Sequence, residues 1–236
     1  MSIGTLPLTD LAPLAVMLPV LGAAVTFMLV RRPRAQITVT VSALVLTLVL
    51  DALLLAAVWD TGVAAVHLGG WPAPLGISLV VDRLSALMLV VSALITLAVL
   101  LYASAQGLIN RDEGGPVSIF HPTFLILVAG VSNAFLAGDL FNLYVGFEIL
   151  LTSSYVLLTM GGTAQRIRAG VTYVVVSVLS SVVFLIAIAM IYAATGTVNM
   201  ADLAVKLGEL PTDVQMVLHV LLLVGFGIKA AVFPLS

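Results

Sequence analysis

The chain of 236 residues contains no cysteine and very little charge. Asp, Glu, Lys and Arg make up only 8% of it, against about 25% in a typical soluble domain. Without cysteine there are no disulfides, thiolate metal sites or cysteine nucleophiles. There is no basic run and no glycine-rich phosphate loop, so we expect neither nucleic-acid nor nucleotide binding. The histidines, which show no metal-ligand spacing, give no reason to expect a metal, and we expect no cofactor; they are His67, His121 and His219.

Long apolar runs are what the chain has instead, since 62% of its residues are hydrophobic. About 20 such residues cross the hydrocarbon core of a bilayer as a helix. We therefore expect an all-α membrane protein with about seven transmembrane helices. The predicted spans are 11–30, 36–58, 84–104, 119–138, 140–160, 169–194 and 214–235. No Lys or Arg precedes the first run and no small-residue cleavage site follows it, so we expect a true span rather than a signal peptide.

The arginines predict the orientation of these spans, because basic residues concentrate in short cytoplasmic loops. Six basic residues follow the first, third and fifth spans, whereas only Arg83 and Lys206 fall in the opposite loops. The six are Arg31, Arg32, Arg34, Arg111, Arg166 and Arg168. We expect a multi-pass protein of the cell membrane with its N-terminus outside and its C-terminus in the cytoplasm.

The outer loops carry structure of their own. The segments VAAVHL and GISLVV flank a turn rich in glycine and proline, which predicts a short β-hairpin. Asp82 is placed to cap the third span and Asp139 the fifth. Asn199 precedes an apolar stripe that ends before Pro211, which predicts a short amphipathic helix on the outer surface.

Glu148 interrupts the fifth span with a charge that is costly inside a membrane. Such residues usually face the interior of the bundle and mark ion or proton pathways. At 100° per residue, a polar stripe runs within about 40° of the direction of Glu148. Its other members are Tyr144, Thr152, Tyr155 and Thr159. We expect this stripe to face neighbouring helices or water; the alternative is a purely structural glutamate.

Lys229 is the matching charge in the seventh span. If both helices run inward, Glu148 lies about 12 Å deep and Lys229 about 20 Å deep, a gap that a lysine side chain closes only if the helices are neighbours. Gly225, Gly227 and Pro234 predict a local break near the lysine, as in transporter ion sites. The alternative is a lysine that extends to the inner interface.

Weaker candidates surround this pair. Together with Tyr173, three serines share one face of the sixth span and could line a hydrated half-channel, although ordinary helix packing is the favoured interpretation. They are Ser177, Ser180 and Ser181. Asn133 is expected to make an interhelical hydrogen bond. Asp51, which shares a stripe with Thr40 and Thr47, is expected near the outer end of the second span as a solvated or capped acid, with a pathway role as the less favoured interpretation.

Two segments resemble a known family. They are FHPTFLILVAGVSNAFLAGDLFNLYVGFEILLTSSYVLL and GFGIKAAVFPL, with GGWPAPLGISLVVDRLSALML as further support. All three resemble the D subunit of the Mrp-type multisubunit Na⁺/H⁺ antiporters, which is related to the antiporter-like, proton-pumping subunits of respiratory complex I. The resemblance implies a proton relay through Glu148 and Lys229, with other small membrane subunits, protons and monovalent cations such as Na⁺ as partners.

The resemblance also implies a division of the chain. Residues 1–105 would form a three-helix segment with the hairpin, and residues 106–236 an incomplete first repeat of an antiporter-like unit. Family members are about twice as long, so we expect the N-terminal half only, a truncated product or fragment.

Three other hypotheses remain open. One is a proton-translocating subunit of an NADH–quinone oxidoreductase-like complex. Another is an inert truncated product. The third is a retinal protein with a Schiff base on Lys229, which the position of Trp59 and Trp71 at or beyond the membrane edge disfavours.

Overall fold

The computed structural model describes residues 8–71, 73–74, 76–106, 119–230 and 232. Their elements are η1 (Leu8–Leu11), α1 (Leu14–Met28), α2 (Pro33–Thr61), β1 (Ala64–His67), η2 (Leu68–Gly70), β2 (Ser78–Val81), α3 (Arg83–Ala105), α4 (Phe120–Leu136), α5 (Leu140–Thr159), α6 (Ala164–Thr195), α7 (Met200–Lys206), η5 (Leu207–Glu209) and α8 (Thr212–Lys229). The predicted all-α membrane fold is confirmed. Each predicted span contains a helix, and the predicted hairpin and the short helix after Asn199 are present.

Six of these helices are long and apolar enough to cross a membrane. The exception among the predicted spans is α4, which has 17 residues. The largest changes from the predicted boundaries are at α6, which begins at Ala164, where Thr163 caps it, and at α8, which ends at Lys229. Arg111 and Pro234 lie outside the described residues.

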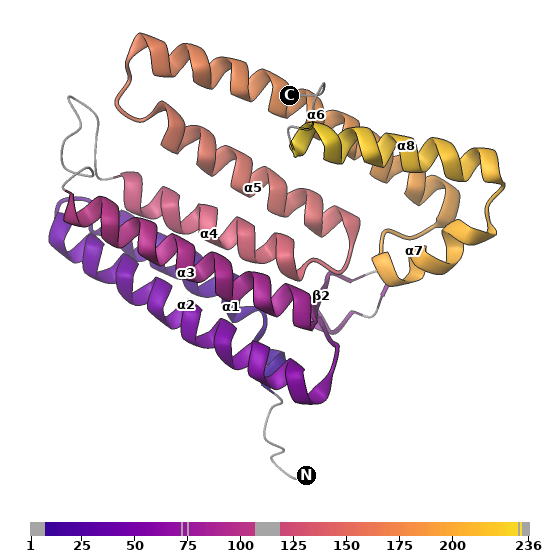
Figure 1. Cartoon of the computed structure of the whole chain (residues 1–236), viewed down its shortest axis with the longest axis horizontal. Helices are drawn as coiled ribbons and strands as arrows, with labels where there is room; N and C mark the ends of the chain where they lie inside the picture. Colours follow the sequence, from indigo (N-terminus) through magenta and orange to yellow (C-terminus); the bar gives the residue numbers. More distant parts are fainter. Residues whose placement is uncertain (1–7, 72, 75, 107–118, 231, 233–236) are drawn as a thin grey trace.

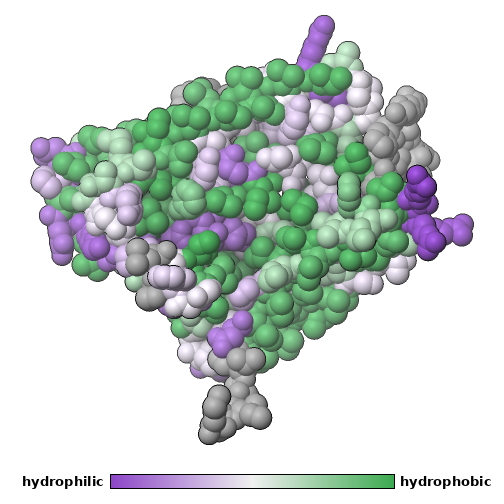
Figure 2. All heavy atoms as spheres, turned by 180° about the vertical axis from the view of Figure 1, so that it is seen from behind, coloured by the Kyte–Doolittle hydropathy of each residue, from purple (hydrophilic) through white to green (hydrophobic). Residues whose placement is uncertain are grey.

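The helices lie side by side in one bundle (Figure 1). α1, α2 and α3 form one side, α4 and α5 the middle, and α6 with α8 the other side. α4 packs mainly against α1 and α5, whereas α8 packs against α6. Seen from behind, apolar side chains cover most of the flanks, and the most hydrophilic residues gather mainly toward the two ends (Figure 2).

We call these ends the hairpin end, which carries β1, β2 and α7, and the arginine end, which carries Arg31, Arg32 and Arg166. The structure contains no membrane, so which end faces the cytoplasm stays a prediction.

Backbone hydrogen bonds join the loops of the hairpin end into one unit. The N–H of Gly138 donates to the carbonyl of Ser78 (2.8 Å), and that of Met200 donates to the carbonyl of Gly138 (3.0 Å). A Cβ on Gly138 would lie 2.8 Å from the Ser78 carbonyl oxygen, so only glycine fits. The β-hairpin, the α4–α5 turn and the start of α7 therefore hold one another in place.

Capping side chains fix where the helices begin, as predicted. Asp82 and Ser85 form a reciprocal capping box at α3. Asp139 accepts the backbone N–H of Asn142 (2.6 Å) at α5, and Asn199 accepts two N–H groups at the start of α7. The Asp139 cap fixes where α5 begins, and with it the direction of Glu148.

Candidate functional site

α5 packs closely against α4 through glycines, and Glu148 lies on a different face of α5 from this contact. A Cβ on Gly146 would lie 3.1 Å from the backbone nitrogen of Ala134, and one on Gly130 would lie 2.9 Å from that of Leu150. With this face of α5 against α4, Glu148 lies on the side of α6 and α8. Its side chain is 34% exposed in the isolated chain.

Lys229 meets Glu148 through a serine of α6. The ammonium Nζ of Lys229 donates to Ser181 Oγ at 2.7 Å. Ser181 Oγ in turn donates to Glu148 Oε1, and Nζ lies 3.5 Å from that oxygen. Three helices thus contribute one residue each to a short chain of hydrogen bonds that runs from ammonium through hydroxyl to carboxylate. We call it the charged triad.

The surroundings of the triad are aromatic. Lys229 Nζ lies 5.8 Å from the ring centre of Phe147, within the range of a cation–π contact. The rings of Phe184 and Phe226 lie 4.9 Å apart, centre to centre, beside it. Only 13% of the lysine side chain is exposed. The amine is therefore held inside the bundle, and the alternative of a lysine extended to the interface does not hold.

α8 approaches α6 closely at Gly225. A Cβ there would lie 3.2 Å from the Phe184 ring, and Ser180 Oγ donates to the Gly225 carbonyl at 3.3 Å. α8 runs without interruption through Gly225 and Gly227 and ends at Lys229. Most of the segment that the predicted break near the lysine concerns, Pro234 included, lies outside the described residues. Gly225 serves close packing here.

A cavity of about 420 Å³ opens beside Lys229 among α5, α6 and α8. Its polar wall contains Tyr173, Ser177 and Ser180, three of the four residues that the sequence predicted on one face of the sixth span. Tyr173 also shares a hydrogen bond of 2.8 Å with Ser154. Ser154 was missed in the sequence, because it lies off the stripe that contains Glu148.

The predicted polar stripe on α5 does not act as one unit. The Tyr144 ring packs between Phe141 and Phe184. The Tyr155 ring lies against Gly170 of α6, where an added Cβ would be 3.3 Å from the ring, so Tyr155 faces a neighbouring helix as expected. Thr152 is exposed on the surface of the described chain, so for this residue the choice between water and a neighbouring helix stays a prediction.

Asn133 makes the expected interhelical contact. Its amide nitrogen donates to the backbone carbonyl of Asn142 at 3.1 Å and to the Asn142 side chain at 3.2 Å. This ties the end of α4 to the start of α5. Among the described contacts, Asn133 stands apart from the charged triad.

Asp51 corrects a prediction. We expected a solvated or capped acid, but its residue is only 1% exposed. It sits in the interior of α2, and neither carboxylate oxygen has a hydrogen-bond partner among the described residues. The error came from judging depth by distance from the loop, when α2 extends to Thr61 and the hairpin covers that end.

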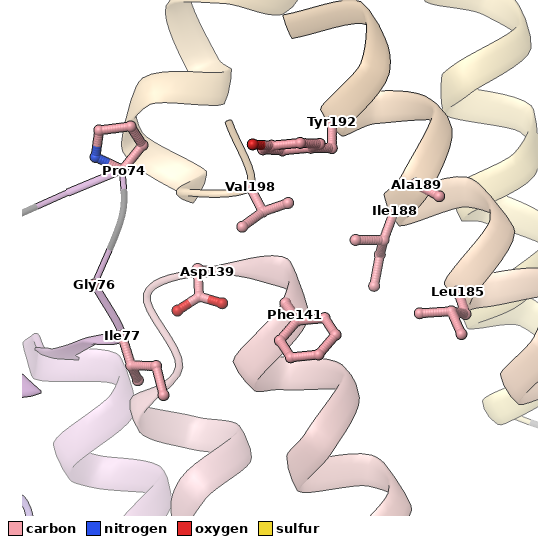
Figure 3. Close-up of a pocket in the computed structure, with 10 residues that line it drawn as sticks. All are labelled: Pro74, Gly76, Ile77, Asp139, Phe141, Leu185, Ile188, Ala189, Tyr192 and Val198. Atoms are coloured by element: carbon pink, nitrogen blue, oxygen red, sulfur yellow. The ribbon is translucent and has the colours of Figure 1, made fainter. Parts of the chain in front are cut away.

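A second pocket, of about 360 Å³, lies at the hairpin end (Figure 3). Asp139 lies in it between Ile77 of the loop before β2 and Val198 of the loop before α7, with Ile188 and Tyr192 of α6 on the far wall. One Asp139 oxygen caps α5, and the rest of the lining is largely apolar. Its geometry gives Asp139 a structural role.

Comparison with known proteins agrees with this arrangement. Residues 137–236 match the family described as NADH:quinone oxidoreductase/Mrp antiporter, TM. The chain is 37% identical to the D subunit of the Na⁺/H⁺ antiporter of Alkalihalophilus pseudofirmus, over 97% of this chain and 46% of that protein. The chain thus spans about half the length of the curated relatives it matches.

Two solved structures are similar as well. One is the Mrp complex from Dietzia sp. DQ12-45-1b, with a TM-score of 0.88 and 33% identity over 97% of this chain and 42% of that chain. The other is the membrane-bound sulfane sulfur reductase, an archaeal respiratory membrane complex, with a TM-score of 0.88 and 29% identity over 96% of this chain and 46% of that chain.

The bundle and these matches define a multi-pass membrane protein of the antiporter-like class. Within that class, residues 137–236 match the family that Mrp antiporters share with NADH:quinone oxidoreductases, and almost the whole chain is similar to D subunits of Na⁺/H⁺ antiporters. The resemblance predicted from the sequence is confirmed.

Proposed function

We propose that the chain is part of a subunit of a monovalent cation/proton antiporter and that its charged triad relays protons. It would act as a transporter subunit, with other membrane subunits as partners. The names of its relatives support this proposal, since they are subunits of such antiporters. The observation that carries the relay is the link from Lys229 through Ser181 to Glu148.

The relay step conserves protons and leaves the serine unchanged. Ser181 passes its hydroxyl proton to the Glu148 carboxylate and takes one from the Lys229 ammonium. The ion pair becomes a neutral acid and a neutral amine. Lysine suits this role because a buried ammonium can release its proton, whereas a guanidinium does not.

The ion pair and the neutral pair of Glu148 and Lys229 can interconvert because the free energies of the two states are similar. Removing two charges from an aromatic setting reduces the desolvation cost, while restoring them regains their mutual attraction. A cation that binds near Glu148 would favour the ionised carboxylate, because the positive charge attracts it. Binding of the cation would therefore promote release of the proton from Glu148. The cavity with Ser177 and Ser180 would give Lys229 a route for proton exchange.

The test is cation-driven proton movement in membrane vesicles that carry the full-length protein with its partner subunits. We expect Glu148→Gln and Lys229→Ala each to abolish pH-dependent Na⁺ extrusion, and Ser181→Ala to slow it about 10-fold or more, as loss of a proton-transfer partner does. Ser153→Ala is the matched control, since Ser153 is buried on α5 and its hydroxyl bonds only within the helix. Normal exchange in either charge variant would remove the triad from the mechanism.

A second candidate is a proton-translocating subunit of a redox-driven complex. The similarity to the archaeal respiratory complex favours it, and the triad would serve equally there. Co-purification with flavin or iron–sulfur subunits, and proton movement that needs electron transfer rather than a cation gradient, would support this candidate over the first.

A further inference from the structure

Asp51 is a buried acid that the charged triad does not use. It lies on α2, on the other side of the bundle from α6 and α8 (Figure 1). Leu44 belongs to one apolar cluster at the arginine end, whereas Leu50 and Leu54 belong to another at the hairpin end. Asp51 therefore lies between two members of the apolar cluster at the hairpin end, about two helical turns from Leu44.

No cation faces this carboxylate from the described elements packed against α2. Those elements are η1, α1, α3 and α4, and their titratable side chains are Asp10, Arg83, Tyr102 and His121. Arg83 donates to the carbonyl of Trp59, which is about 12 Å further along α2. Asp10 and Tyr102 are exposed.

His121 bonds to Thr40 instead, and α2's own charges lie at its ends, in Arg34 and Asp60. An ionised carboxylate buried without a counter-charge or hydrogen bonds costs several kcal/mol or more, and such a group takes up a cation or a proton instead.

A proton fits this site better than a metal ion. Hard cations such as Na⁺ take several oxygen ligands at once, as the coordination of Ca²⁺ and Mg²⁺ illustrates. Neither Asp51 oxygen has a described hydroxyl or amide within hydrogen-bond distance. The hydroxyl of Thr47, the next polar residue on this face, donates within its own helix to Ala43. One isolated carboxyl can bind a proton covalently without further ligands.

A buried polar face leads from Asp51 toward the arginine end. Thr47 is one turn away and Thr40 two turns further, and both are fully buried. Thr40 Oγ1 lies 3.1 Å from Nδ1 of His121, which is also buried. Gln36, another turn along, donates to the carbonyl of Thr26. The opposite direction offers Leu54 and Val58, both buried and apolar.

We propose that Asp51 is a second proton-binding site inside the membrane, separate from the charged triad, and that its proton exchanges along the Thr47–Thr40–His121 face of α2. The site does not depend on the relay proposed above. Its proton is carried on a single carboxyl that is neutral in the folded protein at neutral pH.

Infrared difference spectroscopy on the full-length protein in its membrane complex tests the site. The carbonyl stretch of a protonated carboxylic acid is separate from that of a carboxylate. We expect such a band at neutral pH that is lost in Asp51→Asn and kept in Glu148→Gln. Asp60→Asn, an exposed acid of the same helix, is the control. An unchanged band in Asp51→Asn would overturn the proposal, whatever the fate of cation exchange in the triad variants.

Thermal unfolding provides a second measurement. Asparagine has the shape of a protonated aspartic acid, so we expect Asp51→Asn to assemble with an unfolding midpoint close to that of the unmodified protein. A large fall of the midpoint would mean that an ionised, partnered carboxylate had been removed. If Asp51→Asn fails to assemble, Asp51→Glu is used, because a protonated glutamate keeps the band at a shifted frequency.

The route by which the Asp51 proton exchanges is tested by the rate at which the carbonyl band shifts when deuterium replaces this proton in heavy water. Thr47→Val removes a hydroxyl from the proposed face, and we expect slower exchange. Thr38→Val, an exposed threonine with an equivalent bond inside α2, is the matched control. Equal rates in the two variants would exclude this face as the route.

Discussion

The two acids inside the bundle solve the same physical problem in opposite ways. Glu148 keeps a charge by pairing with Lys229 through Ser181. Asp51 is far more buried than Glu148, yet it has no partner among the described residues. A carboxylate beside an ammonium can exchange a proton with that partner, whereas an isolated carboxyl keeps its proton until more distant groups exchange it. The difference between a relay and a store thus comes from the neighbours of each acid.

Removing Lys229 should have the largest effect on stability. Breaking one side of a buried ion pair costs about 3–5 kcal/mol, and since Glu148 is partly exposed we expect about 2 kcal/mol for Lys229→Ala. The double variant Glu148→Gln/Lys229→Ala should recover most of it, because no lone charge remains. Thermal unfolding of the single and double variants measures this coupling; additive losses would show that the two groups do not interact.

Ser181→Ala should have the next largest effect. The serine bonds to two charged groups, and a hydrogen bond of that kind contributes about 1.5 kcal/mol or more. The direct contact of 3.5 Å between the lysine and the glutamate remains, so the loss should stay below that of Lys229→Ala. The measurement compares the unfolding curves of Ser181→Ala and of the control Ser153→Ala. Equal losses of stability in the two variants would show that Ser181 does not stabilise the ion pair.

Asp51→Val should change stability in the other direction. The apolar side chain fills the same site without a polar group that lacks a partner, so we expect a gain of about 1 kcal/mol. The comparison between the two acids predicts opposite signs for Asp51→Val and Lys229→Ala. A clear loss of stability in Asp51→Val would mean that the carboxyl has a stabilising partner.

The sequence predicted those parts of the molecule that depend on local rules. Apolar runs gave the helices, and the side chains of Asp82, Asp139 and Asn199 gave the caps, because each cap is decided within three or four residues. Glu148 and Lys229 stood out because charges are rare in such runs. The family resemblance supplied the pairing, and side-chain geometry then brought the two atoms within 3.5 Å.

Features that depend on packing were beyond the sequence. Ser181 was one of three equivalent serines, and only the position of α8 singles it out. Depth was misjudged for Asp51, since the hairpin and η1 cover the end of α2 that looked open to water. Thr152 is exposed on the described chain, whereas Glu148 and Tyr155 of the same stripe face other helices, because a helix surface can be covered along part of its length only.

The smallest predicted effect concerns the more exposed ion pair of α7, Asp202 and Lys206. It serves as a reference for the pair of Glu148 and Lys229. On α7, Lys206 Nζ lies 3.0 Å from Asp202 Oδ2, and both side chains are about a third exposed. The hydrogen bond from Lys206 lowers the pKa of Asp202. A lowered carboxyl pKa stabilises the folded state above the ordinary range of the acid, and this contribution disappears as the pH falls through the lowered value.

We expect Asp202→Asn to remove a slight acid-dependent part of the unfolding midpoint and to leave cation exchange unchanged, with Lys206→Met giving the same result. Added salt should weaken this pair, because exposed charges are screened, and should leave the coupling between Glu148 and Lys229 almost intact. Midpoints measured across acidic pH at low and high salt test both statements. If salt weakened the two pairs equally, the charged triad would be in contact with water, and the contrast between the paired and the isolated acid would lose its basis.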